Sequence, residues 1–117
     1  MTLAEIVFQA RKLEKRYGVE GKVAARYVEA GYSVTMLFDT SKGRISFVAK
    51  KAGEVIAADV VYGKIRVTSE IVEKLAEKAA SINAKPVLIL YGGGPELTEE
   101  ALKAAKEKNV AVKRIRG

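Results

Sequence analysis

The side chains in this sequence that could do chemistry are carboxylates and lysines, because it contains no His and no Cys. This composition excludes imidazole bases, thiol nucleophiles, disulfides and Cys/His metal sites. Any metal must therefore be a hard cation bound through oxygen. Asp59 is the most notable carboxylate, since it interrupts the apolar stretch 54–62. An unpaired carboxylate is costly to bury, so we expect Asp59 to be paired, exposed or functional.

A second candidate is the glycine run Gly92-Gly93-Gly94, which follows an apolar stretch and precedes a helix-like segment. Phosphate loops occupy this place in nucleotide-binding folds. The run lacks the Gly-Lys-Ser/Thr of a P-loop and the spacing of a dinucleotide fingerprint. We therefore interpret it as an exit loop after a buried strand.

The spacing of apolar residues predicts the elements that must position these side chains. Helical periodicity covers residues 3–17, 20–30 and 69–82, and Thr98-Glu99-Glu100 begins another helix. Alternation predicts strands over 32–39, 44–50 and 54–62, joined by short turns into an antiparallel meander.

The second half of the chain adds two strands. The uninterrupted apolar run 86–91 is typical of a central strand covered on both faces, and 110–115 forms a last strand. The sequence allows two structures for residues 63–67, either a continuation of the third strand or a loop with Ile65 and Val67 turned inward. The order ααβββαβαβ indicates an α/β fold.

The length of 117 residues and the 49% hydrophobic content predict a single domain spanning 1–117. No apolar stretch approaches the roughly 20 residues of a membrane helix, and the first residues lack the plan of a signal peptide. We therefore expect a cytoplasmic protein with no membrane contact. The three amides Gln9, Asn83 and Asn109 and the high Lys, Glu and Arg content suggest a thermophilic source.

The order of elements from Glu20 to Tyr91 resembles that of the restriction-endonuclease-like, or PD-(D/E)xK, nucleases. Within them it looks most like the archaeal Holliday junction resolvases and small predicted archaeal nucleases of the RecB family. The resemblance implies a restriction-endonuclease-like αβββαβ core with an extra N-terminal helix and a C-terminal helix-strand addition. It also implies a homodimer, because related resolvases are two-fold dimers.

In this family a helix carries a Glu, the second strand an Asp and the third strand Glu-x-Lys. Carried over, these positions fall on Glu20, Ser46 and Asp59-Val60-Val61. The motif is degenerate, since one carboxylate and the lysine are missing. The family's chemistry needs a divalent ion, usually Mg²⁺, to polarise the phosphate and activate water. Ser46 offers a neutral hydroxyl in place of a charge, so Asp59 alone is a poor Mg²⁺ site.

A relocated catalytic set remains an alternative. It would use Glu20, Asp59 and Lys50 as catalytic residues, with Asp59 and Asp39 as ligands of Mg²⁺. Each residue also has a structural interpretation. Glu20 suits the dipole at a helix start, and Asp39 suits the beginning of a turn. A cross-strand partner such as Lys50 or Arg44 would satisfy Asp59.

The 21 basic and 14 acidic residues give a net charge of +7, which favours polyanionic partners. We expect DNA or another nucleic acid to contact Lys42, Arg44, Lys50, Lys51 and Lys64. The leading hypothesis is a nucleic-acid-binding, endonuclease-like domain whose metal-dependent active site has decayed. Two alternatives stay open: an active Mg²⁺-dependent DNA endonuclease with the relocated site, and a structural interaction protein that binds no nucleic acid.

Overall fold

A five-stranded mixed sheet forms the centre of the computed structural model, which describes residues 2–116. The predicted antiparallel meander is confirmed, and its third strand pairs in parallel with β5, which in turn pairs in parallel with β7. The sheet order is β1-β2-β3-β5-β7. The strands are β1 (Ser33–Thr40), β2 (Gly43–Lys51), β3 (Glu54–Tyr62), β5 (Lys85–Tyr91) and β7 (Ala111–Ile115).

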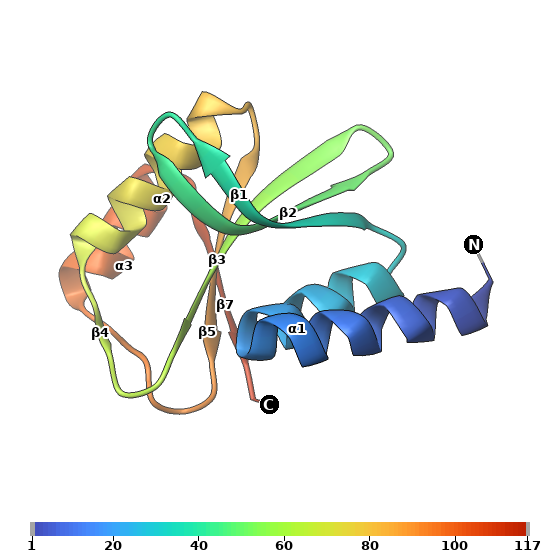
Figure 1. The fold of residues 1–117 in the computed structure, drawn as a ribbon. Helices are drawn as coiled ribbons and strands as arrows, with labels where there is room; N and C mark the ends of the chain where they lie inside the picture. The colour runs from blue at the N-terminus through green and yellow to red at the C-terminus, as the bar shows by residue number, and fades with distance from the viewer. Residues whose placement is uncertain (1, 117) are drawn as a thin grey trace.

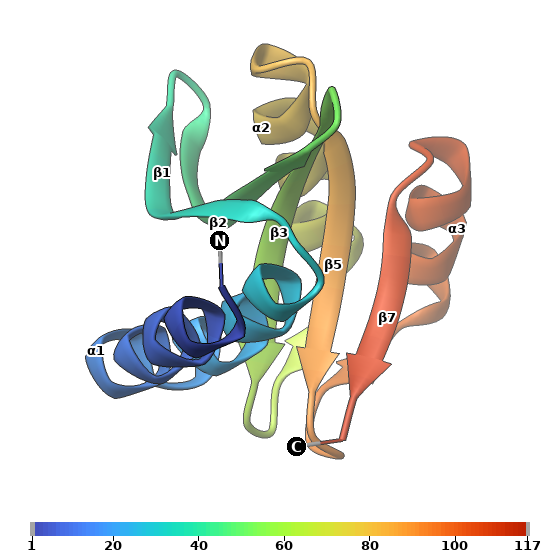
Figure 2. The same ribbon diagram turned by 90° about the vertical axis from the view of Figure 1, so that its right-hand side faces the viewer.

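Helices cover both faces of this sheet (Figures 1 and 2). One face carries α2 (Ser69–Ser81) and α3 (Glu99–Glu107), and the other carries α1 (Leu3–Glu29). Leu88 and Ile89, neighbours on β5, are fully buried and belong to the cores on the two opposite faces. The prediction of a central strand covered on both sides is therefore confirmed. No helix among residues 2–116 has both the length and the hydropathy needed to cross a membrane.

The helix α1 reverses direction at Gly18, where the backbone angles of φ 61° and ψ −132° are not helical. The predicted interruption between two helical segments is confirmed, and Figure 1 shows the chain turning there and running back toward β1. The second segment buries Val23 and Ala24 against the sheet. Gly21 lies directly against the backbone of Leu13, and a Cβ at Gly21 would overlap the Leu13 carbonyl oxygen. The two segments therefore pack backbone to backbone.

The β1–β2 hairpin bends away from β3 toward α2 (Figure 1). Pairing between β2 and β3 stops at Phe47, and Leu37 across the hairpin has φ 50°. As a result, Ile45 packs with Ala79 of α2, whereas Phe47 faces α1. The hairpin turn touches the same helix, since a Cβ at Gly43 would lie 3.3 Å from a side-chain carbon of Lys78.

Residues 63–67 form a loop that ends in a separate short strand. β4 (Arg66–Val67) pairs in parallel with β6 (Glu96–Leu97). Val67 is fully buried, but Ile65 is 42% exposed, so the expected inward position is right for Val67 and wrong for Ile65.

The glycine run 92–94 belongs to the loop packed against this segment. A Cβ at Gly94 would lie 2.5 Å from the Gly63 carbonyl oxygen, so the two loops touch through their backbones. Arg114 holds the loop from β7, because its guanidinium donates to the carbonyl oxygens of Gly92 and Pro95 at 2.6 and 2.7 Å. The glycines thus serve packing between loops.

Replacing Gly21 by Ala tests the backbone contact in α1. The new methyl group would force the two helical segments apart, which we expect to lower the free energy of unfolding by about 2 kcal/mol. Gly53→Ala is the control, since no atom lies within 4 Å of its Cβ position and only its φ of 83° is unfavourable. That strain costs about 1 kcal/mol. Equal losses in urea unfolding would contradict the close packing.

Candidate functional site

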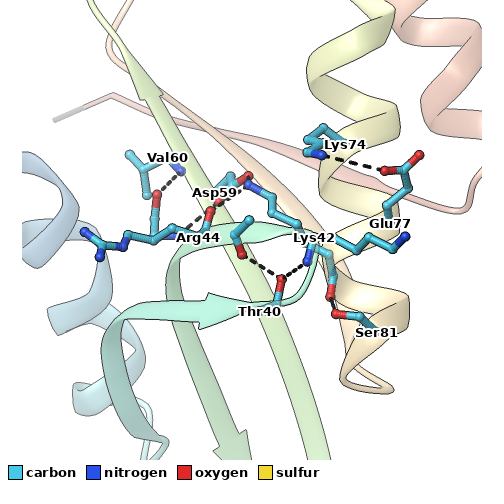
Figure 3. Close-up of polar contacts among 11 residues, drawn as sticks. Thr40, Lys42, Arg44, Asp59, Val60, Lys74, Glu77 and Ser81 are labelled. Carbon is cyan, nitrogen blue, oxygen red and sulfur yellow. Dashed lines mark hydrogen bonds and ion pairs between the residues drawn. The ribbon is translucent and has the colours of Figure 1, made fainter.

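Asp59 of β3 lies on the sheet face that α2 covers, and both its carboxylate oxygens are engaged (Figure 3). Its Oδ1 accepts a hydrogen bond from the Ser46 backbone N–H at 3.0 Å. Its Oδ2 accepts one from Nζ of Lys78 at 2.7 Å. The side chain is 16% exposed. Asp59 is therefore paired and largely buried.

Lys78 of α2 supplies the cation of this pair. Its side chain is 11% exposed, and its Nζ also donates to the carbonyl oxygen of Arg44 at 2.8 Å. The ammonium thus ties α2 to both β2 and β3. A buried ammonium is stable where hydrogen bonds and an opposite charge compensate its lost hydration, and Lys78 has both. The expectation that Lys50 or Arg44 would be the partner of Asp59 is wrong.

Ser46 and Asp59, the two strand positions that the resemblance matches to metal ligands, do lie side by side. The Ser46 hydroxyl accepts a hydrogen bond from the Val60 N–H at 3.1 Å, while Asp59 accepts from the Ser46 N–H. These two bonds bridge β2 and β3 where their ladder has ended. Val61, at the position of the motif lysine, packs against the apolar core below α2 and α3.

These donors do not fit a divalent cation. Mg²⁺ needs several oxygen ligands, usually with one or two carboxylates. Asp59 supplies a single carboxylate here, and Lys78 holds one of its oxygens. Within residues 2–116, no three Asp or Glu side chains gather where they could hold a metal ion together. An ammonium stands beside Asp59 where a metal would have to bind.

The other members of the relocated set lie apart from Asp59. Glu20 is half-buried on α1, the helix that covers the opposite sheet face. Lys50 is exposed and pairs with Ser33 and Val55. Its position four residues beyond Ser46 places it about 13 Å further along β2. The structure does not bring these groups together at one site.

Asp39 is held by Arg44 across the hairpin turn. The Nε of Arg44 lies 2.8 Å from Oδ1 of Asp39, and both side chains are more than half exposed. This hydrogen bond and the adjacent positive charge lower the pKa of Asp39, and the same contact raises the pKa of Arg44. Asp39 therefore closes the turn and does not contribute to a site with Asp59.

The five cations predicted to contact nucleic acid lie in three places. Lys42 and Arg44 are at the hairpin turn, Lys50 and Lys51 at the opposite end of β2, and Lys64 in the loop after β3. Lys51 donates to the Ala30 carbonyl oxygen at 2.7 Å. Among residues 2–116, no carboxylate lies within ion-pair distance of Lys42, Lys50 or Lys64. These three charges are exposed to an external anion.

Comparison with known proteins shows the fold. No protein-family model matches the sequence, and no curated protein matches it. Several solved structures resemble it at 13–16% identity. A repair endonuclease from Pyrococcus abyssi matches with a TM-score of 0.62, 16% identity and coverage of 99% of this chain and 47% of that chain.

Two further structures share the same arrangement. SfsA of Pyrococcus furiosus, in complex with Ca²⁺, has a TM-score of 0.57 and 13% identity over 92% of this chain and 55% of that one. EndoMS in complex with double-stranded DNA has a TM-score of 0.53 and 14% identity over 72% of this chain and 37% of that one. The chain spans about half the length of these proteins or less.

A double-mutant cycle tests the Lys78–Asp59 pair. Lys78→Met leaves the Asp59 carboxylate buried without its cation, and Asp59→Asn leaves the Lys78 ammonium buried without its anion. Each variant should therefore lower the free energy of unfolding by about 3 kcal/mol. The double variant should lose at least 1 kcal/mol less than the sum of the two. Denaturant unfolding measures all three. The exposed pair provides the control, since Asp39→Asn should change stability little. Additive losses would contradict the coupling.

Proposed function

We propose that this chain, which has the restriction-endonuclease-like fold, binds nucleic acid through exposed basic side chains and has lost metal-dependent cleavage. The observation that carries the proposal is the contact between Nζ of Lys78 and Oδ2 of Asp59 at 2.7 Å. At the position where the resemblance implies a metal, the protein supplies its own cation. The fold is kept while the group that would activate water is replaced.

The residues beside this contact support the loss of cleavage. Hydrolysis of a phosphodiester by this family needs a metal that polarises the phosphate and lowers the pKa of water. Ser46 carries no charge, and its hydroxyl is occupied by the Val60 N–H. Lys78 donates to two protein oxygens and is largely buried, so its ammonium is not presented to a phosphate.

The charge distribution supports nucleic-acid binding. The net charge of +7 favours association with a polyanion through release of its counterions. Lys42, Lys50 and Lys64 have exposed ammonium groups that can contact phosphates. Two of the similar structures point the same way, since one is a repair endonuclease and another is bound to double-stranded DNA.

Labelled linear and branched DNA, incubated with Mg²⁺ and with Mn²⁺, tests both halves of the proposal. We expect binding in a gel shift that weakens steeply as salt rises, with no cleavage by either metal. Cleavage that Asp59→Ala abolishes, in a variant that circular dichroism shows to be folded, would establish the alternative of an active Mg²⁺-dependent endonuclease. If the chain binds neither DNA nor RNA, the remaining alternative is a structural interaction protein that binds no nucleic acid.

Variants locate the binding surface. Replacing Lys42, Lys50 and Lys64 together by Ala should weaken DNA binding by tenfold or more at low salt, because three phosphate contacts are lost. The matched control replaces Lys103, Lys106 and Lys108, three exposed cations on or just after α3, and removes the same net charge. An equal loss in the two triple variants would show that net charge alone sets the affinity.

A homodimer is a further part of the proposal. Leu3, Val7 and Phe8 leave large apolar side chains exposed on the first segment of α1, at 76%, 40% and 64%. Such a surface supports contact with a second copy, as the resemblance to two-fold resolvases implies. Light scattering should give twice the 12.7 kDa of one chain, and Phe8→Ser should shift the mass toward the monomer. A monomeric wild-type protein would contradict this part.

A cytoplasmic location and a thermophilic archaeal source stay predictions.

A further inference from the structure

A cavity of about 770 Å³ lies between the first segment of α1 and the beginning of β1. The first segment of α1 contributes Lys12, Lys15, Arg16 and Tyr17, and the opposite wall includes Tyr32. The sharp reversal at Gly18 creates this space, because it carries the first segment back along the second. The volume falls in the range of about 300–1,000 Å³ that is usual for small-molecule sites.

The lining of the cavity is both cationic and apolar. Lys12, Lys15 and Arg16 lie along one side, and none of the lining residues is Asp or Glu, within the chain that the structure describes. Apart from Gln9 and Ser33, the other lining residues are aliphatic or aromatic. Such a lining selects a ligand that has an anionic group at one end and an apolar or aromatic body at the other.

Tyr17 and Tyr32 form the aromatic part of the cavity lining. Tyr17 and Tyr32 are half-buried, so each leaves part of its surface accessible. The hydroxyl of Tyr32 donates to Glu54 at 3.4 Å, and burial together with this carboxylate raises the pKa of Tyr32. The guanidinium of Arg16 lies 5.4 Å from the Tyr17 ring centre, which places positive charge directly beside an aromatic surface.

We propose that this cavity binds one unpaired nucleotide of a nucleic-acid strand, an inference that rests on the proposed function. The phosphate would lie against Lys12, Lys15 and Arg16, and the base against Tyr17 and Tyr32. A nucleotide joins an aromatic base to a phosphate, which matches the neighbouring cationic and aromatic parts of the lining. A base in contact with an aromatic side chain gains affinity without reading its sequence.

The exposed cations and half-buried tyrosines of the site favour an unpaired base over a duplex. The bases of a duplex are stacked and paired inside it, so a base enters a protein cavity after leaving the stack, and this step is easiest where it is already single-stranded. A duplex would meet the cations at the rim and leave the aromatic part empty. The cavity therefore distinguishes a strand end or a single-stranded segment from continuous duplex.

Fluorescence anisotropy with two labelled DNA probes tests the inference. One probe is a blunt duplex and the other is the same duplex with a single-stranded thymidine tail. We expect the tailed probe to bind tenfold or more tightly at the same salt. The double variant Lys12→Ala, Arg16→Ala and the single variant Tyr17→Leu should each remove that preference. Equal affinity of the wild-type protein for both probes would overturn the inference.

A matched control separates this site from general charge. The control replaces Arg11, an exposed cation on the same helix that does not line the cavity, together with Lys103 of α3. It removes two positive charges, as the cavity variant does, and should keep the preference for the tailed probe. Loss of the preference in both double variants would overturn the assignment to this cavity.

Thymidine 5′-monophosphate distinguishes failure of this inference from failure of the proposed function. Should the chain bind neither probe, the proposed function is wrong, and NMR titration with the mononucleotide tests the cavity directly. Shifts of the Tyr17 and Tyr32 ring signals, absent in the Lys12→Ala, Arg16→Ala variant, would support a nucleotide site. Unchanged signals, or signals that respond to oleate and not to the mononucleotide, would overturn it.

Discussion

The ion pair between Lys78 and Asp59 is the interaction on which the positions of α2, β2 and β3 depend. It joins a carboxylate from β3, an ammonium from α2 and the Arg44 carbonyl from β2 in a largely buried place. Each group is stable there because the others compensate its lost hydration. The β1–β2 hairpin can therefore leave β3 at Ser46 and close over α2. The pair therefore holds three elements of the fold together.

Most of the fold could be predicted because its signals are local. Alternation marks β1, the apolar run marks β5, and Gly18 marks the end of a helical segment. Features that depend on tertiary contacts left no such signal. The short strands β4 and β6 have two residues each, too few for a pattern. Alternation alone would place Ile45 beside Phe47, but the bend at Ser46 turns it to the other face.

Of the two charged residues at the candidate site, Asp59 was identified from the sequence and Lys78 was missed. Asp59 is conspicuous because it interrupts an apolar strand, and its pairing was one of the expected outcomes. Its partner carries a comparable signal, since Lys78 falls within the apolar stripe of Ile71, Leu75 and Ala79 on α2 and Ile82 just after it. A cation on a buried helix face and a carboxylate on a buried strand are each unfavourable without a partner. Sequence separation hid their match, because the two residues are 19 positions apart and belong to different elements.

The break in the β2–β3 ladder also determines how the hairpin can open. The amides of Ser46 and Val60 donate to side chains, Oδ1 of Asp59 and Oγ of Ser46, in place of carbonyls of the facing strand. Protection of the Ser46 amide from solvent hydrogen exchange therefore depends on the carboxylate that Lys78 holds, and protection of the Val60 amide depends on the Ser46 side chain beside it. Local opening of the hairpin would separate the buried charges, so these two amides should exchange together with the core of the sheet and not with the exposed turn.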